Sequence, residues 1–228
     1  MKTPLRRVRA AFTLIEILVV LAVIGILAAI LFPVFSSARE SARTTTCASN
    51  LHQISLGFQL YLDNSNRRYP AVNLSKDRFN CSWADMMVPY TRSEKIFNCP
   101  SDPTDDTEFR SAECPGDSSL IEAAKFNGSY GLNTLPIAKI QGTPENRVRR
   151  PSSTLLVTDF DPTLYNVILP GPNTGEPRAY GTPADIATMG IPVPGWHREG
   201  ANVLFVDGHV KWMNIEEMCD ERLWIPDK

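Results

Sequence analysis

The sequence predicts an α+β protein, in which a long N-terminal helix that crosses a membrane with its first half precedes a domain with an antiparallel β-sheet and long loops. Residues 12–35 form an apolar run with a single charged side chain. Apolar residues then recur at three- and four-residue steps as far as residue 62, which is typical of a helix with one buried face. Residues 202–213 alternate around an Asp-Gly pair, which is typical of a β-hairpin.

The apolar run 12–35 is long enough to cross a membrane. Its 24 residues would form a helix of roughly 36 Å, against a hydrocarbon core of about 30 Å. The run is too long for the core of an ordinary secretory signal. The leader before it has no acid and four basic residues, Lys2, Arg6, Arg7 and Arg9. Because cytoplasmic flanks carry an excess of basic residues, we expect the leader to stay inside and the C-terminal part to be exported.

Glu16 is the one charged residue of the apolar run. A carboxylate in lipid costs several kcal/mol unless it is neutralised or paired, and residues 12–35 include no basic side chain. A cut between Ala11 and Phe12 would create a new α-amino group close to Glu16. That amine, on the same or a neighbouring copy, would supply the missing positive charge.

The segment Ala-Phe-Thr-Leu-Ile-Glu at residues 11–16 resembles the class III signal of type IV pilins and type II secretion pseudopilins. The resemblance implies that a prepilin peptidase cuts between Ala11 and Phe12 and methylates the new amine of Phe12. It implies that Glu16 pairs with a neighbour's N-terminus during assembly and that Pro33 kinks the helix. Ala11 stands where the family usually has Gly. We expect this difference to slow processing at most.

This resemblance implies a pilin-like structural subunit rather than an enzyme, working in a bacterial type II secretion or type IV pilus-like system. The expected partners are the prepilin peptidase, other pilin or pseudopilin subunits and membrane lipid. The expected location is the cytoplasmic membrane, crossed once, with the C-terminal domain in the periplasm or at the cell surface. The alternative is a membrane-tethered module that binds a ligand or metal ion through the loop 161–195 and the corner at His197 and Asp207.

Further motifs resemble the DUF1559 group of large pilin-like proteins. They are Trp83, the Pro-Tyr pair 89–90, the Cys-Pro-Ser segment 99–101 and residues 129–133. His197 and the pair Asp207 and Gly208 match the H-X9-DG pattern that names C-terminal domains in this group. We expect His197 to hold its loop by hydrogen bonds to the turn at Asp207, and His209 to be exposed. The sequence has no G-x-S-x-G, H-E-x-x-H or phosphate-binding glycine motif.

The chain is predicted to divide into a leader at 1–11, a membrane helix at 12–35, its continuation at 36–62, and an extracytoplasmic domain at 63–228. The turn-forming residues 63–66 should end the helix. Within the domain we expect a short helix at 83–90, an extended piece at 96–100, a buried strand ending at residue 159, and a surface excursion at 161–195.

The hairpin 202–213 is predicted to turn through two residues, Asp207 and Gly208, because this pair readily adopts positive φ angles. In that register Val206 faces His209. Four apolar residues would then share the face that packs on the long helix: Val203, Phe205, Val210 and Trp212.

Five cysteines would meet an oxidising compartment if the domain is exported. Cys81, Cys99 and Cys114 lie in one loop-rich region, so we expect a disulfide among them, with the pair left open. Cys47 is expected to be a small packing residue of the helix. The sequence has no C-x-x-C pair, which argues against zinc.

An acidic loop near residues 102–117 raises the question of Ca²⁺, because oxygen ligands on a loop suit this ion. Asp102, Asp105 and Asp106 are weak candidates, but their spacing matches no EF-hand. A solvated loop is the preferred interpretation, and no cofactor is expected.

The charge balance bears on partners. The chain has 23 basic and 25 acidic residues, a formal net charge of −2, and without the leader only 19 basic residues remain. Surfaces that bind nucleic acid are normally basic. We therefore expect no nucleic-acid partner.

Overall fold

The computed structural model describes residues 13–70, 83–103, 128–133, 143–159, 183, 191–192 and 195–224. The chain forms two compact units, Met1–Arg39 and Glu40–Lys228, and each is described by itself. The domain boundaries predicted from the sequence stay predictions.

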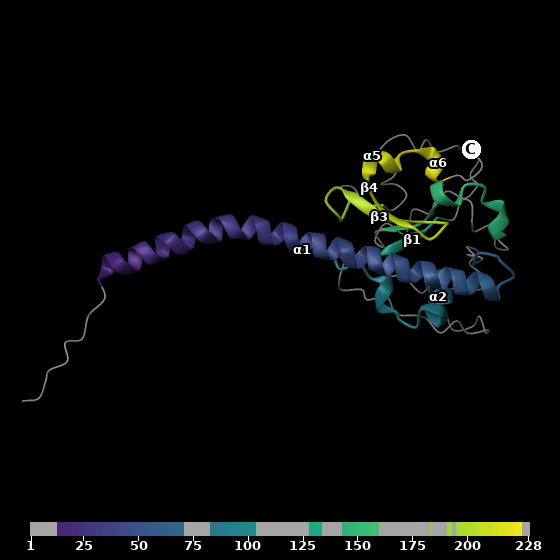
Figure 1. Ribbon diagram of the computed structural model, residues 1–228, viewed down its shortest axis with the longest axis horizontal. Helices are drawn as coiled ribbons and strands as arrows, with labels where there is room; N and C mark the ends of the chain where they lie inside the picture. The colour runs from purple at the N-terminus through teal and green to yellow at the C-terminus, as the bar shows by residue number, and fades with distance from the viewer. Residues whose placement is uncertain are drawn as a thin grey trace, which may run out of the picture. The chain divides into compact units, whose positions relative to one another are not determined.

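Helix α1, Leu14–Asn64, belongs to both units and continues through Pro33 without interruption (Figure 1). This confirms the long N-terminal helix. It ends where the turn-forming residues were expected: the carbonyl of Leu62 accepts hydrogen bonds from the amides of Ser65 and Arg67. Asn66 and Arg67 have positive φ angles of 52° and 57°, which the regular helix does not allow.

Four antiparallel strands form the sheet of the second unit, in the order β1-β2-β3-β4. They are β1 Tyr130–Leu132, β2 Leu155–Asp159, β3 Gly200–Phe205 and β4 Val210–Asn214. The α+β class is confirmed, and β2 is the buried strand that the sequence predicted. Every residue of the two inner strands, β2 and β3, is buried.

Short helices complete the second unit. Helix α2, Trp83–Thr91, confirms the helix predicted at 83–90. The extended piece expected at 96–100 is wrong, because Lys95–Phe97 forms the 3-10 helix η1, in which the amide of Phe97 donates to the carbonyl of Glu94. The other short helices are η2 Glu145–Arg147, η3 Pro151–Ser153, α5 Ile215–Met218 and α6 Glu221–Trp224.

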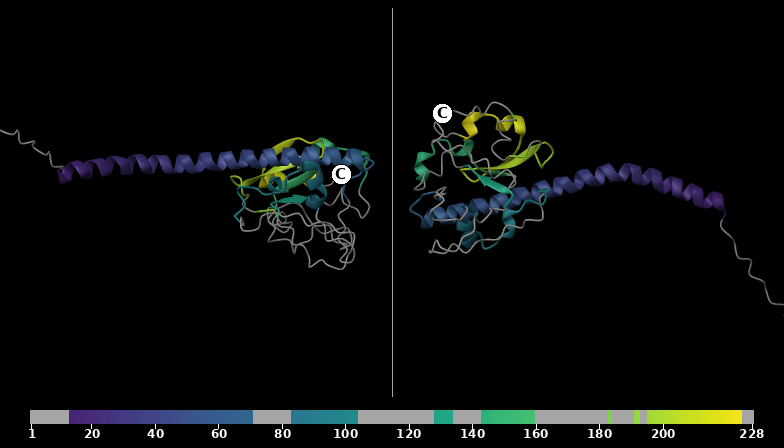
Figure 2. Two further views of the ribbon diagram at one scale, coloured as in Figure 1. Left: turned by 90° about the horizontal axis from the view of Figure 1, so that it is seen from below. Right: turned by 180° about the vertical axis from the view of Figure 1, so that it is seen from behind.

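Two hydrophobic clusters lie on opposite faces of the sheet. Leu204 of β3 belongs to a cluster with the second half of α1, with α2 and with η1. Its neighbours Val203 and Phe205 belong to a cluster with α5 and α6. Figure 2 shows α5 and α6 on the side of the sheet away from this part of α1. Because successive side chains of a strand point to opposite faces, β3 contributes to both cores.

The hairpin between β3 and β4 exists, but its predicted register is wrong by one residue. Leu204 pairs with Val210, and the amide of Phe205 donates to the carbonyl of His209. The loop therefore has three residues, and Gly208 at its end has a φ of +93°. A three-residue loop that ends in a residue of positive φ is a common alternative to the two-residue turn.

The one-residue shift changes which side chains share a face. Trp212 lies opposite Asn202 and is 43% exposed, so it does not join the core that was predicted for it. Val203 and Phe205 do share a face, but they pack with α5 and α6 and not with the long helix. Val210 does pack against the cluster of the long helix, as predicted. Because a strand alternates its faces, the one-residue error misplaces Val203 and Phe205 on that face.

The turn of this hairpin lies against α1. Ser55 of α1 donates a hydrogen bond to the carbonyl of Gly208 at 3.4 Å. A Cβ atom on Gly208 would lie 2.8 Å from the same hydroxyl. Glycine is therefore required here both for its positive φ and for the close approach of the helix.

Candidate functional site

The first turn of α1 contains the carboxylate that the sequence singled out. Glu16 accepts hydrogen bonds from the amide of Thr13 at 2.8 Å and from its hydroxyl at 2.7 Å. The hydroxyl of Thr13 in turn accepts from the amide of Glu16 at 3.3 Å. This reciprocal pattern is a capping box, and the Thr-x-x-Glu spacing at residues 13–16 could have revealed it. Ala11 and Phe12 lie outside the described residues.

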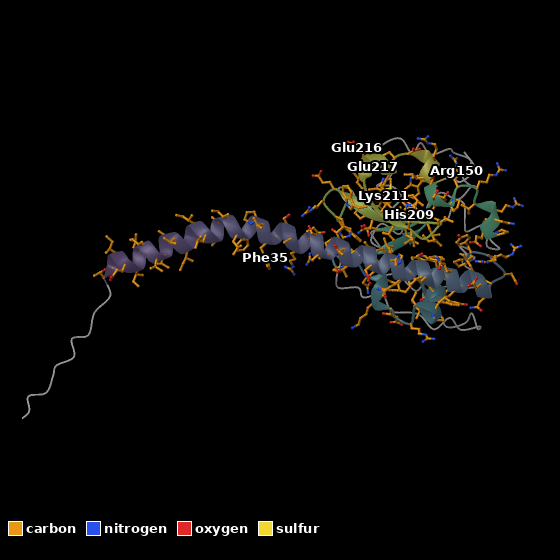
Figure 3. The ribbon with its side chains drawn as sticks, viewed as in Figure 1. Phe35, Arg150, His209, Lys211, Glu216 and Glu217 are labelled. Carbon is orange, nitrogen blue, oxygen red and sulfur yellow. A yellow bond between two sulfur atoms is a disulfide. The ribbon has the colours of Figure 1, made fainter. Side chains whose placement is uncertain are left out.

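The side chains of α1 between Leu14 and Phe35 are exposed along the whole segment. Its large apolar residues are 49–82% exposed. Figure 3 shows them projecting from the helix, with Phe35 labelled. By length and composition α1 can cross a membrane, and it is the one such helix in the part of the chain that the structure describes.

A second site of interest lies in the globular unit, around His197. The amide of His197 donates to the carbonyl of Gly200, and the amide of Gly200 donates back. Between them Arg198 and Glu199 have positive φ angles of 51° and 64°, which cost energy for residues with side chains. The indole of Trp212 donates to the carbonyl of His197 at 2.9 Å. This strained turn is therefore held in place from β4.

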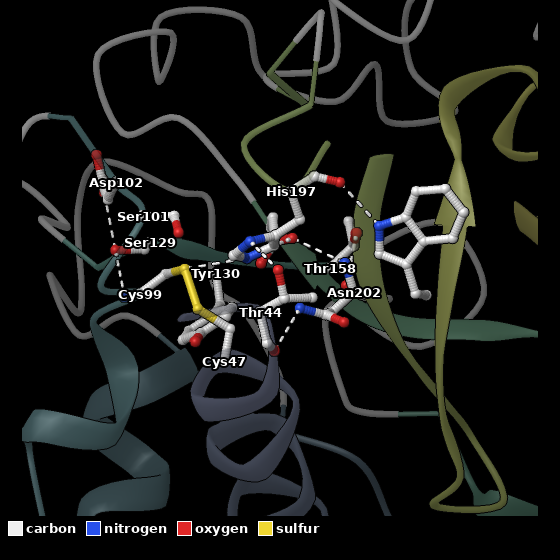
Figure 4. A network of polar contacts seen from close by, with 12 residues as sticks. Thr44, Cys47, Cys99, Ser101, Asp102, Ser129, Tyr130, Thr158, His197 and Asn202 are labelled. Atoms are coloured by element: carbon white, nitrogen blue, oxygen red, sulfur yellow. Dashed lines mark hydrogen bonds and ion pairs between the residues drawn. A yellow bond between two sulfur atoms is a disulfide. The ribbon is translucent and has the colours of Figure 1, made fainter. Parts of the chain in front are cut away.

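The imidazole of His197 is completely buried and contacts three separate segments (Figure 4). Nδ1 lies 3.0 Å from a carboxylate oxygen of Glu40 and 3.2 Å from the hydroxyl of Thr44, both on α1. Nε2 lies 3.2 Å from Sγ of Cys99 and 3.6 Å from the carboxylate of Asp159. The predicted hydrogen bonds from His197 to the turn at Asp207 are therefore wrong, because the ring points toward α1 and β2.

Cys99 is bonded to Cys47 of α1, across 52 residues of sequence. The prediction that Cys47 is a simple packing residue is wrong. The bond also excludes the two predicted pairings that involve Cys99, whereas a pair between Cys81 and Cys114 stays a prediction. Nearness in the sequence suggested a local pair, whereas packing of the segment after η1 on α1 brings the distant sulfur atoms together. Cys81 and Cys114 lie outside the described residues.

Asp159, at the end of β2, is a buried carboxylate beside His197. Its Oδ2 accepts from the amide of Asn202 at 2.8 Å, and its Oδ1 has no hydrogen-bond partner among the described residues. Burial raises the pKa of Asp159 to about 6, although the nearby His197 and the Asn202 amide oppose the rise. Neither Asp159 nor Glu40 was singled out from the sequence, where each is a single acid without a motif.

The other predicted site residues lie elsewhere. Asp207 contacts His209, with Oδ1 2.6 Å from Nδ1, on the exposed side of the hairpin. Asp102 accepts a hydrogen bond from the hydroxyl of Ser129 at 2.8 Å, which ties the loop to β1. Asp105 and Asp106 lie outside the described residues, so Ca²⁺ binding stays a prediction.

A surface pocket of about 320 Å³ adjoins His197. Its lining combines two hydroxyls, a guanidinium, the imidazole and an indole, from Ser41, Thr44, Arg198, His197 and Trp212. The guanidinium of Arg198 donates to the hydroxyl of Ser41 at 2.7 Å. His197 lines this pocket, although it has no exposed surface of its own.

Comparison with known families gives two matches. Residues 6–32 match the prokaryotic N-terminal methylation motif. Residues 36–98 match a protein family of unknown function, DUF1559. No curated protein and no solved structure matches the chain. The second match ends at residue 98, so the resemblance of residues 197–208 to the H-X9-DG pattern stays a prediction.

Proposed function

We propose that this chain, which carries a prepilin-type N-terminal signal followed by a DUF1559 domain, is a structural subunit processed by prepilin peptidase. The enzyme would cut between Ala11 and Phe12 and methylate the amine of Phe12. The mature subunit would then assemble with other pilin or pseudopilin subunits in a type II secretion or type IV pilus-like system. Its C-terminal domain would lie outside the cytoplasm.

The observation that carries this proposal is the methylation motif at the start of a helix whose apolar side chains are exposed. A single-pass anchor needs an apolar helix but not this signal. A subunit needs both, because the helix holds the precursor in the membrane and later packs among copies.

Glu16 would have two roles: it caps the first turn of α1, and it would pair with the amine of a neighbouring subunit. A matched pair of variants separates these roles. Glu16→Gln keeps the hydrogen-bonding capacity of the cap but removes the charge. Thr13→Ala removes the cap partner but keeps the charge. If Glu16 pairs with the amine of a neighbouring subunit, Glu16→Gln inserts normally but fails to assemble, whereas Thr13→Ala assembles. Assembly of the Gln variant at the wild-type level would contradict the charge pairing.

Processing is tested by mass spectrometry of the N-terminus of the membrane-extracted protein. The proposal expects the mature chain to begin with N-methylated Phe12. A chain that still begins with Met1 in cells that have an active prepilin peptidase would overturn the proposal. Such a result would favour the tethered binding module, for which the pocket beside His197 is the supporting feature.

A further inference from the structure

Three atoms that bind soft and borderline metals meet in the buried corner around His197. Sγ of Cys47, Sγ of Cys99 and a ring nitrogen of His197 lie within 4.8 Å of one another. They come from α1, from the segment after η1 and from the turn before β3. We propose that reduction of the Cys47–Cys99 disulfide turns this corner into a zinc site, with both thiolates and Nε2 of His197 as ligands. This proposal does not depend on the assembly function.

The histidine is oriented as a metal ligand would be. Glu40 accepts at its 3.0 Å contact, so Nδ1 carries a hydrogen, and in the neutral ring the lone pair is then on Nε2, which faces Cys99. A metal-binding histidine usually donates its second ring N–H to a carboxylate in this way. Ser101 also donates to the same oxygen of Glu40 at 2.8 Å, which holds the carboxylate in place.

The spacing suits a tetrahedral ion. Ligands around Zn²⁺ lie roughly 3.4 Å apart for a nitrogen and an oxygen, and about 3.6 Å apart for a nitrogen and a sulfur. Nε2 lies 3.2 Å from Sγ of Cys99, and the carboxylate of Asp159, 3.6 Å from Nε2, lies beside this group without belonging to it. Asp159 is fully buried, and its Oδ1 lacks a hydrogen-bond partner among the described residues. A cation beside this carboxylate would compensate for its burial.

The disulfide closes the site, because two sulfur atoms bonded to each other cannot act as thiolates. Opening it takes two electrons from a reductant, such as a dithiol or a phosphine, and two protons. With a phosphine and water, the products are two thiols and the phosphine oxide. Zinc then displaces both thiol protons. The pocket lined by Thr44, His197 and Trp212 adjoins this corner.

The test uses the full chain in detergent micelles, oxidised or reduced with a phosphine, and titrated with Co²⁺ and then Zn²⁺. The reduced chain should bind one Co²⁺, with the charge-transfer absorption of thiolate–cobalt bonds and the visible bands of a tetrahedral ion. Zn²⁺ should displace it, and the oxidised chain should show neither band. A reduced chain that gives no thiolate–cobalt absorption would overturn the proposal.

Variants show whether these cysteines are the ligands. Cys47→Ser should abolish the thiolate–cobalt signal, whereas Cys219→Ser and the double variant Cys81→Ser/Cys114→Ser should keep it. Glu40→Gln should weaken binding by about 10- to 100-fold, as expected for a carboxylate that orients a ligand. A signal that survives in Cys47→Ser, or is lost in the double variant, would place the metal elsewhere and overturn the proposal.

Loss of the fold is controlled by thermal unfolding of the same samples. Zn²⁺ should raise the Tm of the reduced wild type, because a ligand that binds only the folded state stabilises that state. It should leave the Tm of reduced Cys47→Ser unchanged, because this variant lacks one of the ligands. His209→Gln, in the exposed hairpin, should respond to Zn²⁺ like the wild type. An equal Tm of the reduced wild type with and without Zn²⁺ would contradict the proposal.

Discussion

The two halves of α1 have the same secondary structure and opposite surroundings. Between Leu14 and Phe35 the helix is apolar on all sides, and its large side chains are exposed. From Cys47 to Leu62 it is mixed in composition, and its buried residues are Cys47, Leu51, Ile54, Ser55, Gly57, Phe58 and Leu62. An apolar residue therefore contributes to the stability of the folded domain only in the second half. In the first half it is exposed and available for contact with lipid or other subunits.

The largest expected contrast is between Phe58→Ala and Phe32→Ala. Phe58 is 2% exposed and stacks on Trp83 with ring centroids 5.8 Å apart. Its loss should lower the free energy of unfolding by about 3–5 kcal/mol, through lost burial and the cavity left behind. Phe32 is 80% exposed, and its loss should change the same quantity by less than about 0.5 kcal/mol. Denaturant unfolding in micelles, followed by tryptophan fluorescence, measures both, and equal effects would contradict the contrast.

The disulfide gives the second half of α1 a covalent link to the domain. Replacing Cys47 and Cys99 together by Ala should lower the free energy of unfolding by about 2–4 kcal/mol, because the bond constrains a 52-residue separation in the unfolded chain. Cys219→Ala is the matched control, since Cys219 is not part of the Cys47–Cys99 disulfide. If the double variant unfolds at the wild-type denaturant concentration, the link does not stabilise the domain.

A Gly→Ala substitution can be compared in the two halves of α1, at Gly25 in the exposed half and at Gly57 in the buried half. A Cβ on Gly57 would lie 2.7 Å from a methyl carbon of Thr91, whereas a Cβ on Gly25 would have no atom within 4 Å. Gly57→Ala gains helix propensity but must displace the methyl group of Thr91, so we expect a net loss of about 1 kcal/mol. Gly25→Ala should leave the unfolding of the domain unchanged. Thermal unfolding of both variants tests this, and a stabilised Gly57→Ala would mean that Thr91 moves away without cost.

The smallest expected effect concerns Tyr69, which packs on Phe58 and has a buried hydroxyl without a hydrogen-bond partner among the described residues. At pH 7 Tyr69→Phe should change the free energy of unfolding by less than about 1 kcal/mol, because no hydrogen bond is lost. Burial raises the pKa of Tyr69 in the folded state. The folded state therefore keeps its proton above pH 10, where the unfolded phenol ionises, and stability falls as the pH rises.

The alkaline loss of stability distinguishes this variant from the wild type. Tyr69→Phe should show a shallower decline in unfolding free energy between pH 9 and about 11. Burial also raises the pKa of Tyr130, so some decline remains in the variant. Parallel pH profiles for the two proteins would indicate that the Tyr69 hydroxyl is already solvated in the folded state.

Much of the fold could be predicted from local patterns. The period of apolar residues gave α1 its extent, and turn-forming residues marked its end near Asn64. Helix α2, strand β2 and the β3–β4 hairpin were also predicted from short-range signals. The predicted hairpin register was wrong, because Asp-Gly fits both a two-residue and a three-residue loop. In the three-residue loop that forms, Gly208 packs against Ser55.

The candidate sites divide in the same way. Prepilin signals are linear, so Ala11, Phe12 and Glu16 could be proposed from order and spacing alone. The corner around His197 takes its side chains from residues 40, 44, 47, 99, 159 and 197, and no local pattern relates them.

The sequence by itself determined the membrane-length helix, its signal and the α+β class, because hydrophobic period and turn chemistry act over a few residues. Only the tertiary structure decided the hairpin register, the Cys47–Cys99 pair and the acids that face His197. Those features depend on packing of separate segments against α1 and the sheet, which brings together residues as far apart as Glu40 and His197, 157 positions.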